Sequence, residues 1–164
     1  INSDDFYADS SVIADIVEAM QEQSVEAIYA DLQYVNEKNT SRITRTWRSG
    51  KYTLRGFRWG WMPPHPTFFV ARRLYEDFGT FNTNLKSAAD YELMLRLLYK
   101  HKVKAYYLPR VTVKMRLGGV SNSSLANRIR ANKEDRKAWT INGLNAHFFT
   151  TYLKPLRKVT QFIF

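Results

Sequence analysis

Two adjacent acids near the start of the chain, Asp4 and Asp5, are the first residues whose types could do chemistry. They follow Ile1-Asn2-Ser3, which we interpret as the end of a strand, and ligands bind at that edge of open α/β sheets. Adjacent carboxylates there suit Mg²⁺ or Mn²⁺, hard cations that neutralise phosphate oxygens. An acidic pair before a helix is also typical of a capping turn, so both interpretations stay open.

Asp90 opens a candidate helix after a loop, within Ala88-Ala89-Asp90-Tyr91-Glu92. An N-cap role explains this placement, because the carboxylate would accept hydrogen bonds from free amides and interact favourably with the helix dipole. A general base needs similar placement, on a rigid helix start with its oxygen in a cleft. The residues alone favour the cap and keep the base as the alternative.

His65 lies between Pro64 and Pro66, so its backbone is held stiffly. The nearby Trp59 and Trp61 could stack on sugar rings or on bases. A loop histidine packed by aromatic side chains would look the same in the sequence. His65 is therefore a candidate binding residue with a purely structural alternative.

Several enzyme classes lose support from what the sequence lacks. There is no Cys, which excludes a disulfide scaffold, a thiolate nucleophile and a Cys-ligated zinc or iron–sulfur site. We find no Ser-His-Asp spacing, no P-loop and no His-x-x-x-His pattern. No stretch approaches the roughly 18 to 20 consecutive apolar residues that a membrane span needs.

The formal net charge of +10 predicts an anionic partner. Residues 38–75 contain nine basic residues and no acid, and residues 127–164 contain eight basic residues against two acids. Nucleic acid, phospholipid headgroups and the phosphates of a sugar nucleotide could each satisfy such a surface. Charge by itself does not choose among them.

The elements that must position these residues alternate between helices and strands, which predicts an α/β fold. Apolar spacing predicts an amphipathic helix over 10–23, and Gly79 is expected to end another helix. The expected elements are a helix over 10–23, strands over 25–35 and 42–48, a long loop over 50–66 with one helical turn, an apolar segment running into a helix over 68–78, a helix over 90–101, strands over 105–108 and 111–116 separated at Pro109, a basic helix over 123–142 and a short amphipathic helix over 152–164.

Five short motifs in this order resemble the second half of a family 2 glycosyltransferase of the GT-A fold. The resemblance covers about residues 1–120. The motifs are Asn2-Ser3-Asp4-Asp5, Pro64-His65-Pro66-Thr67-Phe68-Phe69-Val70-Ala71-Arg72-Arg73, Gly79-Thr80-Phe81-Asn82, Ala89-Asp90-Tyr91-Glu92-Leu93-Met94-Leu95-Arg96 and Leu108-Pro109.

The resemblance implies a partial GT-A, Rossmann-like mixed sheet with flanking helices, whose N-terminal nucleotide-binding half has no counterpart here. It divides the chain into residues 1–120, the C-terminal part of the catalytic domain, and residues 121–164, a basic helical extension. We expect this 164-residue piece to be catalytically silent. We also expect the exposed sheet edge at Ile1 to pair with a second copy, giving a homodimer.

The resemblance assigns roles to single residues. Asp5 inherits ligation of the divalent metal, Mn²⁺ or Mg²⁺, and Asp4 a neighbouring contact to the donor. Asp90 inherits the role of general base, although Ala89 stands where the family usually has a second acid. His65 is expected to line the donor-sugar pocket. The residues expected to contact the acceptor or phosphate are Trp61, Arg72, Arg73 and Glu92.

The implied function is inverting transfer of a sugar from a UDP- or GDP-linked donor to a saccharide or lipid-linked saccharide, as in cell-envelope polysaccharide synthesis. The implied location is cytoplasmic, at the inner face of the membrane. Residues 146–164 mix aromatic and basic side chains, which predicts either a helix on an anionic membrane or a cover for the domain's own core. The alternative function is a basic nucleic-acid-binding module without catalytic activity.

Overall fold

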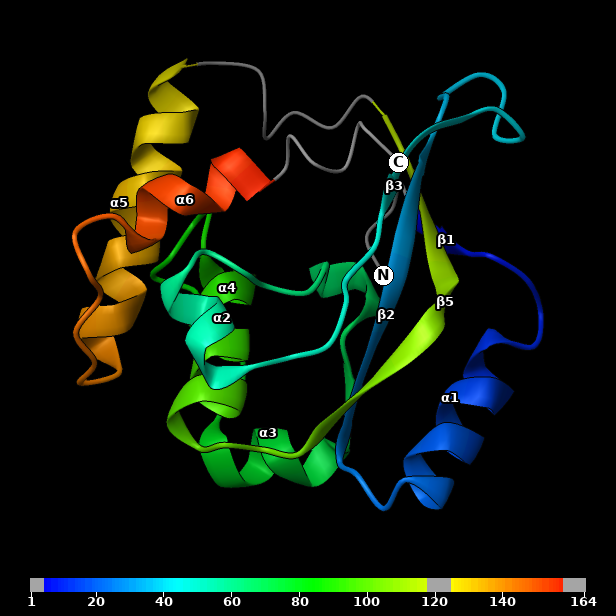
Figure 1. Cartoon of the computed structure of the whole chain (residues 1–164), viewed down its shortest axis with the longest axis horizontal. Helices are drawn as coiled ribbons and strands as arrows, with labels where there is room; N and C mark the ends of the chain where they lie inside the picture. The colour runs from blue at the N-terminus through cyan, green and yellow to red at the C-terminus, as the bar shows by residue number, and fades with distance from the viewer. Residues whose placement is uncertain (1–4, 118–124, 158–164) are drawn as a thin grey trace.

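The computed structural model describes residues 5–117 and 125–157 as an α/β fold built around a mixed five-stranded sheet (Figure 1). The strands run in the order β1-β5-β2-β3, and β4 also pairs with β2. The strands are β1 (Asp5–Tyr7), β2 (Ala27–Val35), β3 (Ile43–Trp47), β4 (Phe69–Val70) and β5 (Ala105–Arg116). The helices are α1 (Val12–Glu22), α2 (Leu54–Arg58), the 3₁₀ turn η1 (His65–Thr67), α3 (Arg72–Phe78), α4 (Ala89–Met94), the π-helical η2 (Leu95–Lys100), α5 (Leu125–Ile141) and α6 (Thr150–Arg157).

β2 is the central strand, and its first six residues are buried. It runs parallel to β5 and antiparallel to both β3 and β4. A strand buried on both faces needs apolar residues at consecutive positions, which explains the uninterrupted Ala27-Ile28-Tyr29-Ala30 run. The predicted α/β class and the hairpin of β2 and β3 are confirmed.

β5 differs from the prediction, because it continues through Pro109 instead of stopping there. Ala30 pairs with Leu108 and Asp31 with Val111, so Pro109 and Arg110 are extra residues in the ladder. Proline has no backbone N–H to donate, and an irregularity at this position removes the need for that donor. Pairing on both sides of the irregularity keeps the strand in one piece.

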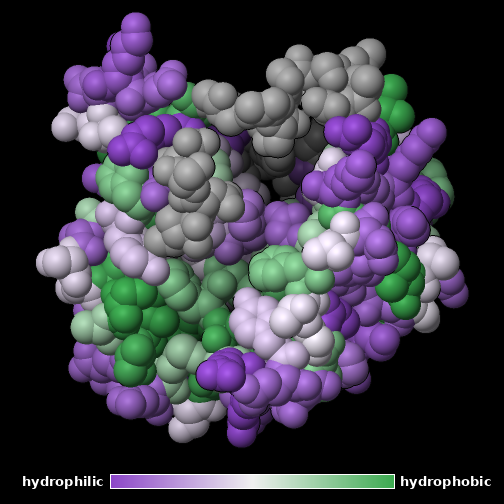
Figure 2. Space-filling model, turned by 180° about the vertical axis from the view of Figure 1, so that it is seen from behind, coloured by the Kyte–Doolittle hydropathy of each residue, from purple (hydrophilic) through white to green (hydrophobic). Residues whose placement is uncertain are grey.

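Helices cover the sheet on two sides, with α1 apart from the other helices (Figure 1). Val12, Ile16 and Ala19 of α1 pack against Ile28 of β2, which confirms the predicted amphipathic helix. The exposed face of α1 still carries apolar residues, seen from behind as a hydrophobic patch in Figure 2. No helix in the described ranges is long and apolar enough to cross a membrane.

The largest apolar cluster joins α2, α4, η2 and α5 to the sheet. Trp139 of α5 is buried beside Tyr91 of α4, and its Nε1 donates a hydrogen bond to the Tyr91 hydroxyl at 2.9 Å. The described part of the C-terminal extension therefore shares a core with residues 5–117.

α6 is held against the turn that follows α2. Gly60 in that turn has φ +75°, and a Cβ placed there would lie 2.5 Å from the backbone nitrogen of Lys154. A side chain at position 60 would thus collide with the backbone of α6. Glycine is required here both for the left-handed conformation and for the close approach of the helix.

We expect Gly60→Ala to lower the free energy of unfolding by about 2 to 4 kcal/mol in urea denaturation. Left-handed strain costs about 1 kcal/mol, and the collision with α6 adds about 1 to 3 kcal/mol. Gly143→Ala is the matched control, because Gly143 has φ +70° but nothing within 4 Å of its Cβ position. Equal losses in the two variants would show that the contact with α6 contributes nothing.

Candidate active site

The structure brings His65 and Asp90 together, with Nδ1 of His65 3.0 Å from Oδ2 of Asp90. The two residues come from different elements, η1 and the first turn of α4. Both side chains are partly exposed, 39% and 29% respectively, so the pair borders solvent. A carboxylate paired with an imidazole at the surface is an arrangement that can accept a proton from a bound hydroxyl.

The position of His65 is fixed by the turn that carries it. Thr67, in the same turn, donates a hydrogen bond from Oγ1 to the carbonyl of Ala30 at 2.9 Å. The backbone N–H of Ala30 in turn donates a hydrogen bond to Oγ1 of Thr67 at 3.3 Å. These contacts tie η1 to the central strand and, with the flanking prolines, restrict His65.

Asp90 is not the N-cap that the residue types favoured, because Ala88 occupies that position. Burial by itself would raise the pKa of Asp90. The hydrogen bond from His65, the positive charges of His65 and Lys154 and the backbone N–H of Tyr91 outweigh burial and hold that pKa below its usual value. Asp90 is therefore ionised at neutral pH, as a general base must be before it takes a proton.

Lys154 of α6 is a member of this cluster that sequence reasoning missed as a site residue. Its Nζ lies 2.8 Å from each carboxylate oxygen of Asp135 and 4.0 Å from the centre of the Tyr91 ring. The lysine thus adds positive charge beside the residue that follows Asp90. Nothing local in the sequence distinguishes it from the other basic residues of the C-terminal part.

Glu92, expected to contact the acceptor or phosphate, is buried inside the fold instead. Its side chain is 2% exposed and pairs with Arg96 at 2.9 Å, while Asn142, which directly follows α5, donates to the same oxygen. Arg96 also donates to the carbonyls of Phe78, Gly79 and Thr80. The ion pair of Glu92 and Arg96 therefore lies in the interior, where it connects the loop at 78–80 to α4 and to the end of α5.

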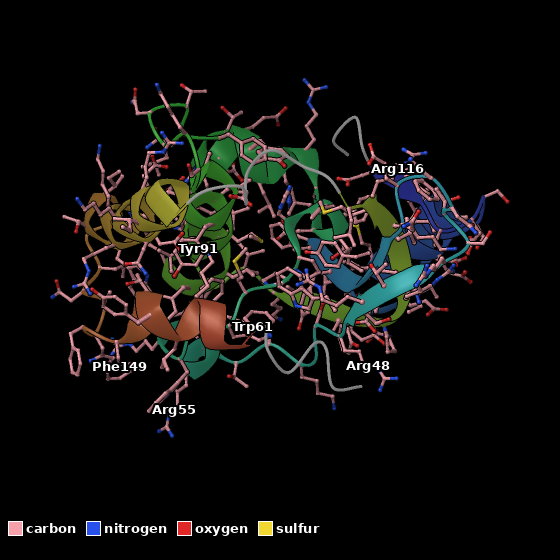
Figure 3. The ribbon with its side chains drawn as sticks, turned by 90° about the horizontal axis from the view of Figure 1, so that it is seen from above. Arg48, Arg55, Trp61, Tyr91, Arg116 and Phe149 are labelled. Carbon is pink, nitrogen blue, oxygen red and sulfur yellow. The ribbon has the colours of Figure 1, made fainter. Side chains whose placement is uncertain are left out.

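Trp61 is also part of the core rather than of an open surface. It is 8% exposed, stacks edge-on against Tyr29 at 5.5 Å, and donates from Nε1 to the carbonyl of Ser49 at 2.8 Å. Figure 3 shows Trp61 and Tyr91 in the interior, between the helices and the sheet. The exposed tryptophan of this segment is Trp59, at 54%.

Arg72 and Arg73 lie in the first turn of α3, beside the start of β2, and the structure does not bring them to the His65–Asp90 pair. Arg72 pairs with Glu76 at 2.9 Å, and Arg73 pairs with Glu26. Arg72 also lines a shallow surface depression of about 550 Å³ with Tyr75 and Phe81. Their expected contact with acceptor or phosphate stays a prediction.

Asp5 lies in the edge strand β1, opposite Met115 of β5, and Asp4 lies outside the described residues. The Asp5 carboxylate is buried. Burial raises the pKa of the Tyr34 phenol, Arg45 opposes this rise through its charge and hydrogen bond, and the charge of Asp5 adds to it. No group of three or more His, Asp or Glu side chains gathers within residues 5–117 and 125–157. The described residues thus supply one carboxylate, Asp5, to the expected metal site.

Comparison with known proteins adds no assignment. The chain matches no protein-family model, and no curated protein matches it. The case for a function therefore depends on the geometry of the His65–Asp90 pair and on the order of motifs in the sequence.

Arg96→Met tests the buried Glu92–Arg96 ion pair. We expect this substitution to lower the free energy of unfolding by about 3 to 5 kcal/mol, because it leaves the Glu92 carboxylate buried without its counter-charge. Arg72→Met removes an i, i+4 pair whose arginine side chain is 91% exposed and should cost less than about 1 kcal/mol. Urea denaturation measures both. Similar losses would contradict the structural role of Glu92.

The Asp90 carboxyl should titrate below about 3.9, the usual value for aspartate. A folded-state pKa below the unfolded one stabilises the fold above pH about 3.9, and this stabilisation is lost as pH falls through the folded pKa. His65→Gln removes the imidazole charge and should raise the pKa of Asp90. Carbon-13 NMR of the carboxyl, assigned with Asp90→Asn, follows the titration, and a midpoint at or above 3.9 in the unaltered protein would refute this electrostatic account.

Proposed function

We propose that this chain is the acceptor-side part of an inverting, nucleotide-sugar-dependent glycosyltransferase related to family 2 of the GT-A fold. The observation that carries the proposal is the hydrogen bond between His65 and an Asp90 whose pKa is lowered at the start of α4. It joins two of the five motifs on which the resemblance depends. The α/β sheet and the covering helices are compatible with the proposed fold.

Asp90 is the proposed general base. In the inverting reaction the acceptor oxygen forms a bond to the anomeric carbon while the bond from that carbon to the diphosphate breaks. The proton of the acceptor hydroxyl moves to the Asp90 carboxylate, and the electron pair of the broken bond leaves with the nucleoside diphosphate. A base of this kind contributes typically about 10²- to 10⁴-fold in rate.

His65 orients that base. Its ring donates to Oδ2 of Asp90, which leaves the second carboxylate oxygen to receive the acceptor proton. Because Thr67 fixes the turn on β2, the imidazole and the carboxylate keep their relative positions when a substrate binds. The contact of His65 with the donor sugar belongs to the same proposal.

The metal ligand, the donor, the acceptor and the location are proposed from the sequence alone. Asp5 is the proposed ligand for Mg²⁺ or Mn²⁺ when a UDP- or GDP-linked donor is bound, and Asp4 its neighbour on the donor. The acceptor is a saccharide or a lipid-linked saccharide. A cytoplasmic location at the inner face of the membrane and pairing with a second copy also stay predictions.

A nucleic-acid-binding module is the competing proposal, favoured by the acid-free stretch over residues 38–75. It assigns no role to the His65–Asp90 pair. Salt-sensitive binding of random oligonucleotides that Asp90→Asn leaves unchanged, in a protein without transferase activity, would favour this alternative.

Asp90→Asn should reduce sugar transfer about 10²- to 10⁴-fold with donor binding retained, since an amide cannot accept the acceptor's proton. The assay measures nucleoside diphosphate release from UDP- and GDP-sugars by the full-length protein that carries the substitution.

Asp15→Asn is the matched control, because Asp15 also lies in the first turn of a helix, pairs with a cation, and has a 32% exposed side chain against 29% for Asp90. It should leave the rate unchanged. Near-wild-type transfer by Asp90→Asn would remove Asp90 from the reaction.

A further inference from the structure

Helix α2 and the segment that leads into α6 form one surface on which large apolar side chains are exposed. We name it the α2–α6 surface and define it by Leu54, Trp59, Phe148 and Tyr152, which are 45%, 54%, 77% and 61% exposed. Residues far apart in the sequence meet here, because α6 packs on Gly60 (Figure 1). Figure 3 shows Arg55 and Phe149 projecting on the same side of the molecule.

Polar contacts from Arg58 and Arg136 hold the backbone of the α2–α6 surface in place. Arg58 donates from Nε to the Tyr99 hydroxyl at 2.6 Å, and its Nη1 lies 3.1 Å from Nε2 of His147. Arg136 of α5 donates to the carbonyl of Phe148 at 2.7 Å. These contacts fasten the segment before α6, so Phe148 is exposed from an anchored backbone.

The charge on this surface has one sign. Residues 54–59 and 142–157, which supply the two sides of this surface, contain no Asp or Glu. Arg55 is exposed at its centre, and with Arg58 it lines a hollow of about 420 Å³ that also includes Trp59. Exposed apolar groups among positive charges complement a partner that is anionic and also accepts apolar side chains.

We propose that the α2–α6 surface binds an anionic phospholipid bilayer, with Phe148, Tyr152, Trp59 and Leu54 entering the headgroup region and Arg55 contacting lipid phosphates. Aromatic and basic side chains are the combination that amphipathic segments use at membrane interfaces. The sequence offered such binding for residues 146–164 as one of two alternatives, the other being a cover for the domain's own core, whereas the surface proposed here also includes α2. The inference is independent of glycosyl transfer.

A bilayer fits these side chains better than a nucleic acid does. Base stacking needs open ring faces, but the centroid of the Phe149 ring already lies 5.2 Å from those of His147, stacked at 12°, and Trp59, tilted at 32°. Leu54 has no ring, and Phe148 is 77% exposed. Apolar groups of this kind gain free energy by leaving water for a lipid interface.

The test is cosedimentation of the 164-residue chain with vesicles of phosphatidylcholine, with or without phosphatidylglycerol. We expect binding to the anionic vesicles, weaker binding to neutral ones, and weakening as salt is raised. Arg55→Ala should weaken binding about fivefold, and the double variant Phe148→Ser with Tyr152→Ser at least about tenfold. Since all three side chains are exposed, these variants should keep the wild-type circular dichroism and urea midpoint.

Matched controls remove the same kinds of groups elsewhere. Ile13→Ser with Val17→Ser alters the exposed apolar residues of α1, which are 45% and 48% exposed, and Arg42→Ala removes an exposed charge in the turn between β2 and β3. Both should bind vesicles like the unaltered protein.

Failure to bind anionic vesicles, or equal losses in the controls, would overturn the proposal. A random oligonucleotide that binds more tightly than the vesicles and is weakened by the same variants would assign this surface to nucleic acid instead.

Discussion

The buried carboxylate of Glu92 is the constraint on which the arrangement around α4 depends. A charge in the interior needs a counter-charge and further hydrogen-bond donors, since an unpaired one costs several kcal/mol. Arg96 and Asn142 meet that need, and in doing so they bind the loop at 78–80, the helix α4 and the helix α5 to one point. Asp90 lies two residues before Glu92 in α4, so the contacts that fix Glu92 also hold the helix turn that carries Asp90.

The second support of the candidate site comes from the sheet. β2 holds Thr67 through its backbone at Ala30, and Thr67 fixes the turn that carries His65. The two halves of the His65–Asp90 pair are therefore positioned by different parts of the fold. A shift of either part would alter the separation of the two side chains, which makes the pair sensitive to changes remote from it.

Local patterns in the sequence predicted the elements well because their causes are local. The stripe of Val12 and Ile16 specifies α1, and Gly79 ends α3 as expected. The predicted break of the strand at Pro109 was wrong. A proline is tolerated within a strand where the pairing with the partner strand is irregular, and that depends on both strands rather than on the sequence around the proline.

The candidate site was predictable in part, for the same reason. Asp90 and His65 stand out by residue type and motif, but their contact depends on how a proline-rich loop folds back onto β2. Glu92 was expected to contact the acceptor or phosphate, and its burial results from the packing of α4 against α5. The role of Lys154 could not be predicted from its neighbours in the sequence, because it depends on the contact of this lysine with Tyr91 of α4.

The contact of α6 with Gly60 also bears on the order in which the molecule can assemble. Chains are synthesised from the N-terminus, and domains begin to fold as their residues emerge. Gly60 and Tyr91 are made well before Lys154, so a nascent chain that ends before α6 carries Asp90 without the neighbouring ammonium group and leaves the turn at Gly60 uncovered. The electrostatic setting of Asp90 is thus completed only after α6 has left the ribosome.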